Sequence, residues 1–83
     1  MAACEHLRAA RLALEGCAWA RHWRVRLATL EAAGELDLEA LRGLINGLIE
    51  YGPGGDRGRS AAVEHLTRAW KDAACAAPGG VAR

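Results

Sequence analysis

The 83-residue chain contains few of the residues that build β-sheets or large aromatic cores. It has no Phe, and only seven residues are Val, Ile or Thr. No segment alternates between apolar and polar residues with a period of two, which argues against a β-sheet. No run of apolar residues is long enough to cross a membrane. We therefore expect a helical chain that has no membrane partner.

The residues on which most active sites depend are also scarce. Ser60 is the only serine, and the glycine-rich segment 52–55 lacks the Lys-Ser/Thr pair of a phosphate-binding loop. The three cysteines and three histidines include no Cys-x2-Cys pair and have no zinc-site spacing. We therefore expect no catalytic residue, no metal and no cofactor, and interpret Cys4, Cys17 and Cys75 as small buried residues.

The cysteine count and the composition indicate the cellular compartment of the protein and the base composition of its gene. An odd number of cysteines without a pairing pattern favours a reducing compartment. Glu5, His6 and Arg8 interrupt the apolar run that a secretory signal would need. All basic residues except Lys71 are arginine, and Ala and Gly are frequent, which is typical of GC-rich coding. We expect a cytoplasmic protein.

Helical periodicity dominates the rest of the sequence and predicts an all-α bundle of three to four short helices. At this length we expect one helical domain over residues 1–77, followed by a flexible tail over 78–83. The four predicted helices cover residues 2–15, 17–33, 37–51 and 60–77.

The predicted helix starts come from capping residues. Asp37 is a favourable N-cap for a helix whose apolar residues recur from Leu41 to Ile49 at the spacing of one buried face. Ser60 is the expected N-cap of the last helix, after a turn rich in Gly and Pro.

A break is expected near Gly16. Leu7 and Leu14 point to one side of a straight helix, whereas Trp23 and Leu27 point to nearly the opposite side. The alternative is one continuous helix over 2–33 that buries one stripe in the domain and the other in a second copy, which would favour a homodimer. The predicted core comprises Leu7, Leu14, Trp23, Leu27, Leu30, Leu41, Leu44, Ile45, Leu48, Ile49, Val63, Leu66 and Trp70.

Residues 17–26, CAWARHWRVR, form the least ordinary stretch. Trp19 and Trp23 continue into Leu27 and Leu30, so we interpret the tryptophans as a core stripe. The arginines on its flanks are free to bind a partner. They are Arg21, Arg24 and Arg26.

A second candidate feature is Gly43-x-x-x-Gly47. We expect both glycines on the outer side of their helix, opposite Leu44, where small residues four apart permit a close contact. Asn46 lies beside them. Two helix-interior glycines each cost about 1 kcal/mol relative to Ala, so we interpret this side as a partner-docking face.

The charge of the chain is unevenly distributed along its length. The net charge of +1 divides into +3 over residues 1–26, −4 over 27–51 and +2 over 52–83. Segregated charge favours steered docking. The leading hypothesis is therefore a non-catalytic protein-binding module, a regulator or stoichiometric inhibitor of a larger protein with an acidic patch. In size and character it is comparable to phage or mobile-element inhibitors of the anti-CRISPR kind.

Two further hypotheses concern other partners. A nucleic-acid-binding regulator would use the arginines of 17–26 on phosphates and base edges. Arg57 and Arg59 are expected in the loop after the third helix. Together with the arginines of 17–26, they are the predicted contacts to a protein partner or to a nucleic acid. The third hypothesis is a homodimer.

Overall fold

The structure, a computed structural model, describes residues 3–33 and 36–76 and confirms the all-α fold. Within these residues the chain forms four α-helices and one short 3₁₀ helix, with no strand. None of the described helices is long and apolar enough to span a membrane. The predicted tail over 78–83 lies outside the described residues. The elements are α1 (Ala3–Leu14), η1 (Ala18–Ala20), α2 (Arg21–Ala32), α3 (Leu38–Tyr51) and α4 (Arg57–Ala76).

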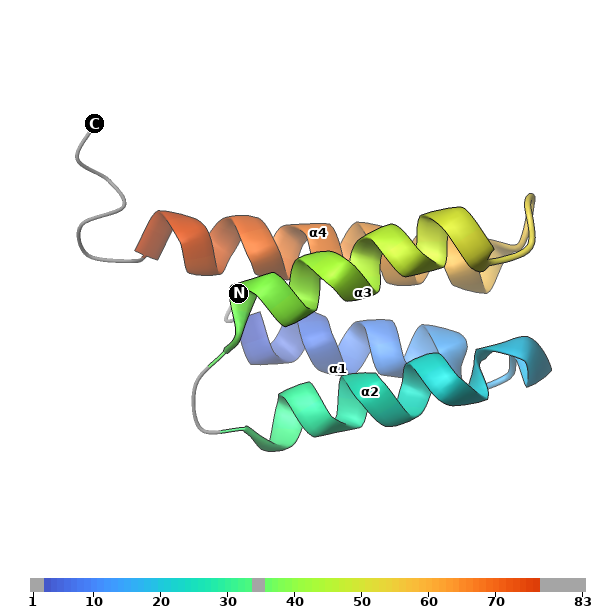
Figure 1. The fold of residues 1–83 in the computed structure, drawn as a ribbon, viewed down its shortest axis with the longest axis horizontal. Helices are drawn as coiled ribbons and strands as arrows, with labels where there is room; N and C mark the ends of the chain where they lie inside the picture. The colour runs from blue at the N-terminus through green and yellow to red at the C-terminus, as the bar shows by residue number, and fades with distance from the viewer. Residues whose placement is uncertain (1–2, 34–35, 77–83) are drawn as a thin grey trace.

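The four helices lie side by side, and each runs antiparallel to the next (Figure 1). α1 packs against α2 and α4, and α3 packs against the same two helices, so the bundle closes into a ring. The α1–α2 and α3–α4 connections meet at one end of the bundle (Figure 1). This is an up-down-up-down arrangement, which short connections between amphipathic helices favour.

The tightest part of the bundle is the contact between α1 and α4. Ala10 on α1 and Ala62 and Ala69 on α4 are fully buried. Small side chains allow two helix axes to approach closely, since the residues at the contact set the distance between the axes. The two helices are therefore held together by alanines as well as by leucines, whereas α2 and α3 share the least extensive contact of the four neighbouring pairs.

Most of the predicted core is confirmed. Seven predicted leucines are buried: Leu7, Leu14, Leu27, Leu41, Leu44, Leu48 and Leu66. Five further predicted residues are partly buried and pack against this core: Trp23, Leu30, Ile45, Val63 and Trp70. The prediction for Ile49 is wrong, because its side chain is 53% exposed. Eight helical residues turn it about 80° away from Leu41, which places it at the edge of the buried face.

The predicted break near Gly16 is confirmed. α1 ends at Leu14, and the turn is closed by the N–H of Cys17, which donates to the carbonyl of Leu14 at 3.0 Å. The predicted helix over 17–33 instead begins as the 3₁₀ turn η1 before α2 starts. Because of this break both apolar stripes face one core, so the continuous helix over 2–33 is wrong. The second stripe, which would have formed the homodimer interface, packs into the core of the same chain.

One predicted helix start is confirmed and the other is wrong. The Oδ1 atom of Asp37 accepts from the N–H groups of Glu39 and Ala40, both at 3.1 Å, and caps α3. α4 begins at Arg57, before the predicted cap Ser60. The Oδ1 atom of Asp56 accepts from the N–H of Arg59 at 2.9 Å, which is the hydrogen bond of an N-cap. Ser60 therefore lies in the first turn of the helix.

Candidate functional site

The indole ring of Trp23 crosses from α2 to α3 and lies on Gly47. A Cβ atom at Gly47 would stand 2.5 Å from Cη2 and 2.7 Å from Cζ3 of Trp23. Gly47 is accordingly buried, and the prediction that it lies on an exposed outer face is wrong. Gly43 and Asn46 are exposed, and a Cβ at Gly43 would meet open space. The close approach that the glycine pattern predicted is made by a tryptophan of the same chain.

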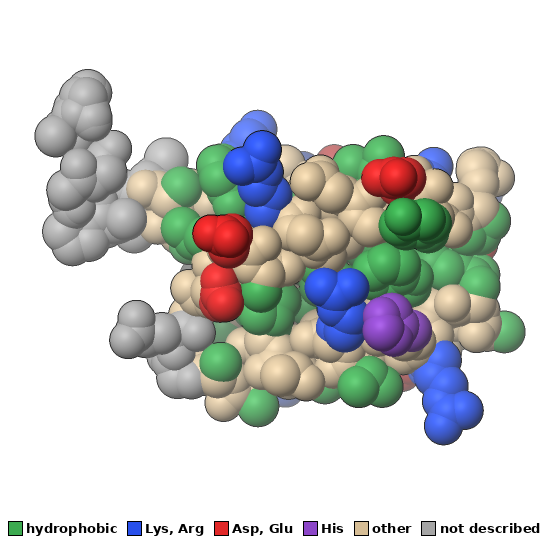
Figure 2. All heavy atoms as spheres, viewed as in Figure 1, with side chains coloured by type: hydrophobic (Ala, Val, Ile, Leu, Met, Phe, Trp, Pro, Cys, Tyr) green, Lys and Arg blue, Asp and Glu red, His purple; other side chains and the backbone are tan. Residues whose placement is uncertain are grey.

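Two side chains of α2 surround the Trp23 ring. The Cζ atom of Arg26 lies 5.4 Å from the ring centroid, a cation–π distance, and the imidazole of His22 meets the ring edge-on at 5.2 Å. Both residues are exposed, and within the described part of the chain no carboxylate pairs with Arg26. Figure 2 shows basic and histidine side chains over α2 on this face, beside hydrophobic ones, with acidic side chains near the two ends of α3.

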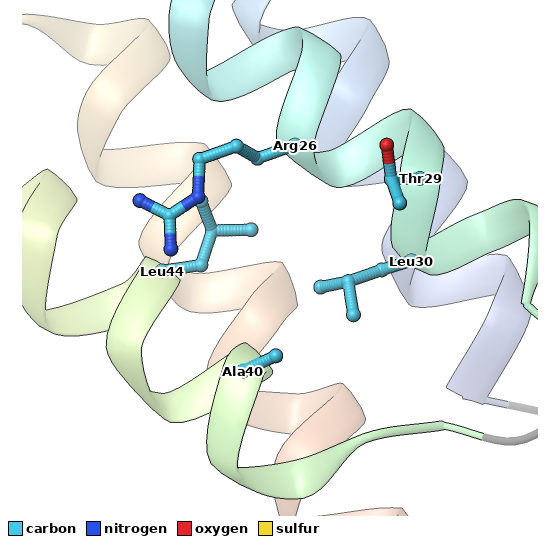
Figure 3. A pocket seen from close by; sticks show the side chains of 5 residues that line it. All are labelled: Arg26, Thr29, Leu30, Ala40 and Leu44. Atoms are coloured by element: carbon cyan, nitrogen blue, oxygen red, sulfur yellow. The ribbon is translucent and has the colours of Figure 1, made fainter.

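Next to this stack, α2 and α3 leave a hollow of about 200 Å³. We call it the α2/α3 hollow; its lining residues are Arg26, Thr29, Leu30, Ala40 and Leu44. Arg26 reaches from α2 across to Leu44 on α3, while Leu30 and Ala40 extend into the space between the helices (Figure 3). The hollow therefore has apolar walls and a guanidinium at its rim.

The five predicted partner-binding arginines differ in what their side chains contact. Nη1 of Arg24 donates to the carbonyl of Glu15 at 3.2 Å, and Nη1 of Arg59 donates to the carbonyl of Ile49 at 3.5 Å. Both satisfy carbonyls near the ends of helices, a common role for arginine.

The other three predicted arginines are exposed. Arg21 and Arg57 make no hydrogen bond or ion pair within residues 3–33 and 36–76, and only Arg26 lines a hollow. Arg57 and Arg59 lie in α4 and not in the predicted loop. Among the five predicted arginines, Arg26 is the one that combines an unpaired charge with a described hollow.

The junction between η1 and α4 is built around the carboxylate of Asp56. Besides capping α4, it accepts from Nε1 of Trp19 at 3.2 Å and from Sγ of Cys17 at 3.7 Å. The backbone N–H of Arg59, followed by the Trp19 and Cys17 donors, lowers the pKa of Asp56 against the opposing effect of burial. The carboxylate is ionised and saturated with donors, as expected of a structural junction.

The environment of Cys17 also determines its reactivity. Burial, and then the neighbouring Asp56 carboxylate, raise the pKa of the Cys17 thiol. A thiol of this kind stays protonated at neutral pH, whereas nucleophilic cysteines have lowered pKa values. The predicted burial of Cys4 is wrong, since it is exposed on α1, and the side chain of Cys75 lies outside the described residues.

A histidine pair at the α1–α4 contact was not found from the sequence. His6 is buried, its Nε2 atom lies 3.2 Å from Oδ2 of Asp72, and its ring centroid lies 6.4 Å from that of His65. The Nδ1 atoms of both histidines are buried without a hydrogen-bond partner. In the part of the chain that the structure describes, no three such side chains are arranged so that they could hold a metal ion.

The sequence also missed a larger hollow, of about 380 Å³, between α3 and α4. Its lining residues are Arg42, Ile45, Thr67 and Trp70. The periodicity correctly places Ile45 and Trp70 toward the core. It does not reveal that a hollow remains between the two helices, which leaves these side chains only partly buried.

Comparisons with protein-family models, with curated proteins and with solved structures give no match.

Proposed function

We propose that this chain is a non-catalytic protein-binding module that docks the α2/α3 hollow onto an acidic surface of a larger protein. The observation that carries the proposal is the Arg26–Trp23 stack at the rim of an apolar hollow. Arginine and tryptophan are the residues most enriched among those that dominate binding energy at interfaces. A partner side chain would fill the hollow while a neighbouring carboxylate pairs with Arg26.

The size of the hollow supports a protein partner over a small substrate. Small-molecule sites enclose roughly 300–1,000 Å³, mostly within concave walls. The α2/α3 hollow measures about 200 Å³ and lies on an open face of the bundle. The protonated thiol of Cys17 and the fully engaged carboxylate of Asp56 further support a binding role over a catalytic one.

The mode of action in this proposal is stoichiometric occupation of a surface, by a regulator or inhibitor of the anti-CRISPR kind encoded by a phage or mobile element. The short chain and its arginine-, alanine- and glycine-rich composition support this. Neither Cys4 nor Cys17 is in a disulfide, which supports a cytoplasmic site of action.

The test is an affinity capture from the lysate of a GC-rich bacterial host, with nuclease treatment and quantitative mass spectrometry. Wild type is compared with Arg26→Glu, which reverses the rim charge, and with Thr29→Glu, which fills the hollow. Arg57→Glu is the charge-matched control, because Arg57 is exposed and distant in sequence from the hollow. We expect one protein to be captured stoichiometrically by wild type and by Arg57→Glu.

The affinity of each variant is then measured with the purified partner. Loss of an interfacial arginine costs about 2 kcal/mol, so Arg26→Glu should weaken the complex roughly thirtyfold or more. Equal affinity of wild type, Arg26→Glu and Thr29→Glu for the captured protein would contradict the proposal. Capture that disappears with nuclease and with Arg21→Glu or Arg57→Glu would instead identify a nucleic acid as the partner.

A further inference from the structure

The larger hollow lies on the other side of α3, between α3 and α4. Ile45 lines it, and Ile49, one helical turn later, is 53% exposed. On α4, Val63 lies one turn before the lining residue Thr67. We call this surface the α3/α4 groove: Arg42, Ile45, Ile49, Val63, Thr67 and Trp70. Ile45 and Trp70 line the hollow itself, and helical spacing places Ile49 and Val63 one turn beyond it, so the strip extends over about two helical turns.

The shape of the strip suits a helix. α3 and α4 run antiparallel on either side of it (Figure 1). The residues that α3 contributes, Arg42, Ile45 and Ile49, recur at i, i+3 and i+7, so they form one straight ridge. A groove between two parallel ridges receives the apolar face of a third helix, as helix-in-groove complexes do.

The rim of the groove carries positive charge that the chain itself does not neutralise. Arg42 on α3 and Lys71 on α4, next to Trp70, are exposed and make no ion pair among the described residues. The nearby Glu64 is already paired with Arg68 at 3.4 Å. A partner with carboxylates beside its apolar stripe would complement this rim.

A second copy of the chain offers no such helix. The buried apolar stripes of α1, α2 and α4 are used in the bundle, and each of α1 and α2 exposes a single large apolar side chain, Leu12 and Val25. The exposed charges of α2 and α4 are mainly basic, and those of α1 are Glu5 and Arg8.

The outer face of α3 is acidic at Glu39 and Glu50, but between them it presents Gly43 and Asn46 and no large apolar side chain. Self-docking would therefore bring together like charges or leave the groove unfilled.

We propose that the α3/α4 groove binds an acidic amphipathic helix of another protein. This helix places Leu, Ile or Phe at i, i+3 or i+4 and i+7 on Trp70 and Ile45, and Asp or Glu beside Arg42 and Lys71. The surface is separate from the α2/α3 hollow, so either one can fail without the other.

The test is a selection from a display library of helical peptides against the full chain. Thr67→Glu blocks the groove, and Thr29→Glu, in the α2/α3 hollow, is its matched control. Both threonine hydroxyls donate only to a carbonyl of their own helix, Thr67 to Val63 at 2.7 Å and Thr29 to Val25 at 3.1 Å. The two substitutions therefore remove the same kind of hydrogen bond, from a partly buried position on α4 and an exposed position on α2.

We expect the enriched peptides to be acidic and amphipathic, to bind Thr29→Glu like wild type, and to bind Thr67→Glu more than tenfold more weakly. The exposed pair Arg42→Glu/Lys71→Glu should switch the preference to the same peptides with Lys in place of Glu. This charge exchange decides the question even if Thr67→Glu fails to fold, as judged by circular dichroism. The proposal is overturned if the selected peptides are basic, if none is sensitive to a groove variant, or if sedimentation shows self-association that Arg42→Glu/Lys71→Glu abolishes.

Discussion

Gly47→Ala and Gly43→Ala introduce the same methyl group one turn apart on α3, and the structure predicts opposite results. Replacing a helix-interior glycine with alanine stabilises a helix by about 1 kcal/mol. At Gly43 nothing lies within 4 Å of the added Cβ, so the full gain should appear. In a domain of this size it corresponds to a rise in Tm of about 4–8 °C.

At Gly47 the added Cβ would stand 2.5 Å from the Trp23 ring, so either the ring or the helix must move. Overpacking of this kind costs about 1–3 kcal/mol, which equals or exceeds the gain in helix propensity. Gly47→Ala should therefore be neutral or destabilising by up to about 2 kcal/mol, and less stable than Gly43→Ala by about 1–3 kcal/mol. Displacement of Trp23 would also disturb its stack with Arg26.

The assay is urea denaturation followed by circular dichroism and tryptophan fluorescence. Trp23→Leu provides the internal control, because without the indole ring Gly47→Ala should regain the stabilisation seen at Gly43, as a double-mutant cycle would show. If Gly47→Ala stabilises the wild-type chain as much as Gly43→Ala does, Trp23 does not lie on Gly47. The assigned geometry of the candidate site would then be wrong.

Three further predictions concern the polar groups inside the bundle. Asp56→Ala should lower Tm more than Asp37→Ala at pH 7, because only Asp56 also ties η1 to α4; equal losses would contradict that role. Hydrogen bonds hold the Asp56 pKa below its unfolded value of about 3.9, so this contribution is present above about pH 4 and is lost as pH falls through the folded pKa. A Tm difference between wild type and Asp56→Ala that persists unchanged at pH 2 would argue against it. The raised pKa and burial of Cys17 predict slow alkylation by iodoacetamide at pH 7.5 relative to the exposed Cys4, measured by peptide mass spectrometry; equal rates would refute this. His6→Leu removes a buried Nδ1 that lacks a partner, but also the Nε2 contact with Asp72, so the comparison is made in an Asp72→Ala background. There it should raise the free energy of unfolding by about 1 kcal/mol, whereas a loss of that size in urea denaturation would show that Nδ1 is satisfied.

Capping residues and helical periodicity are sufficient to predict most of the fold from the sequence. Asp37 caps α3 as its position before an apolar stripe predicts, because that capping depends only on neighbouring backbone N–H groups. The phase change between Leu14 and Trp23 correctly locates the break near Gly16, because a straight helix cannot turn both stripes to one core. The prediction of Ser60 as the N-cap of α4 is wrong because Asp56, four residues earlier, is also a capping residue. Asp56 caps the helix instead, and a hydrogen bond from Trp19 holds its carboxylate in place.

The candidate site was less predictable, because it depends on distances between helices. Periodicity assigns Gly47 to one side of α3, but it does not show that the Trp23 side chain extends from α2 far enough to cover Gly47. Likewise, Arg24 and Arg26 have the same sequence character, yet Arg24 satisfies a carbonyl of the α1–α2 turn while Arg26 faces a hollow. Which arginine is free follows from the packing of the helices and not from local pattern.

The most direct test of the central claim, that the α2/α3 hollow docks on a protein, is photocrosslinking in living cells of a GC-rich bacterial host. A photoreactive phenylalanine replaces Thr29, which lines the hollow, or Leu12 on α1, which is 54% exposed and does not line it. We predict one discrete protein adduct from position 29, absent from position 12, whose crosslinked segment in the partner contains Asp or Glu. Identical adducts from both positions, or an adduct to nucleic acid alone, would contradict the claim.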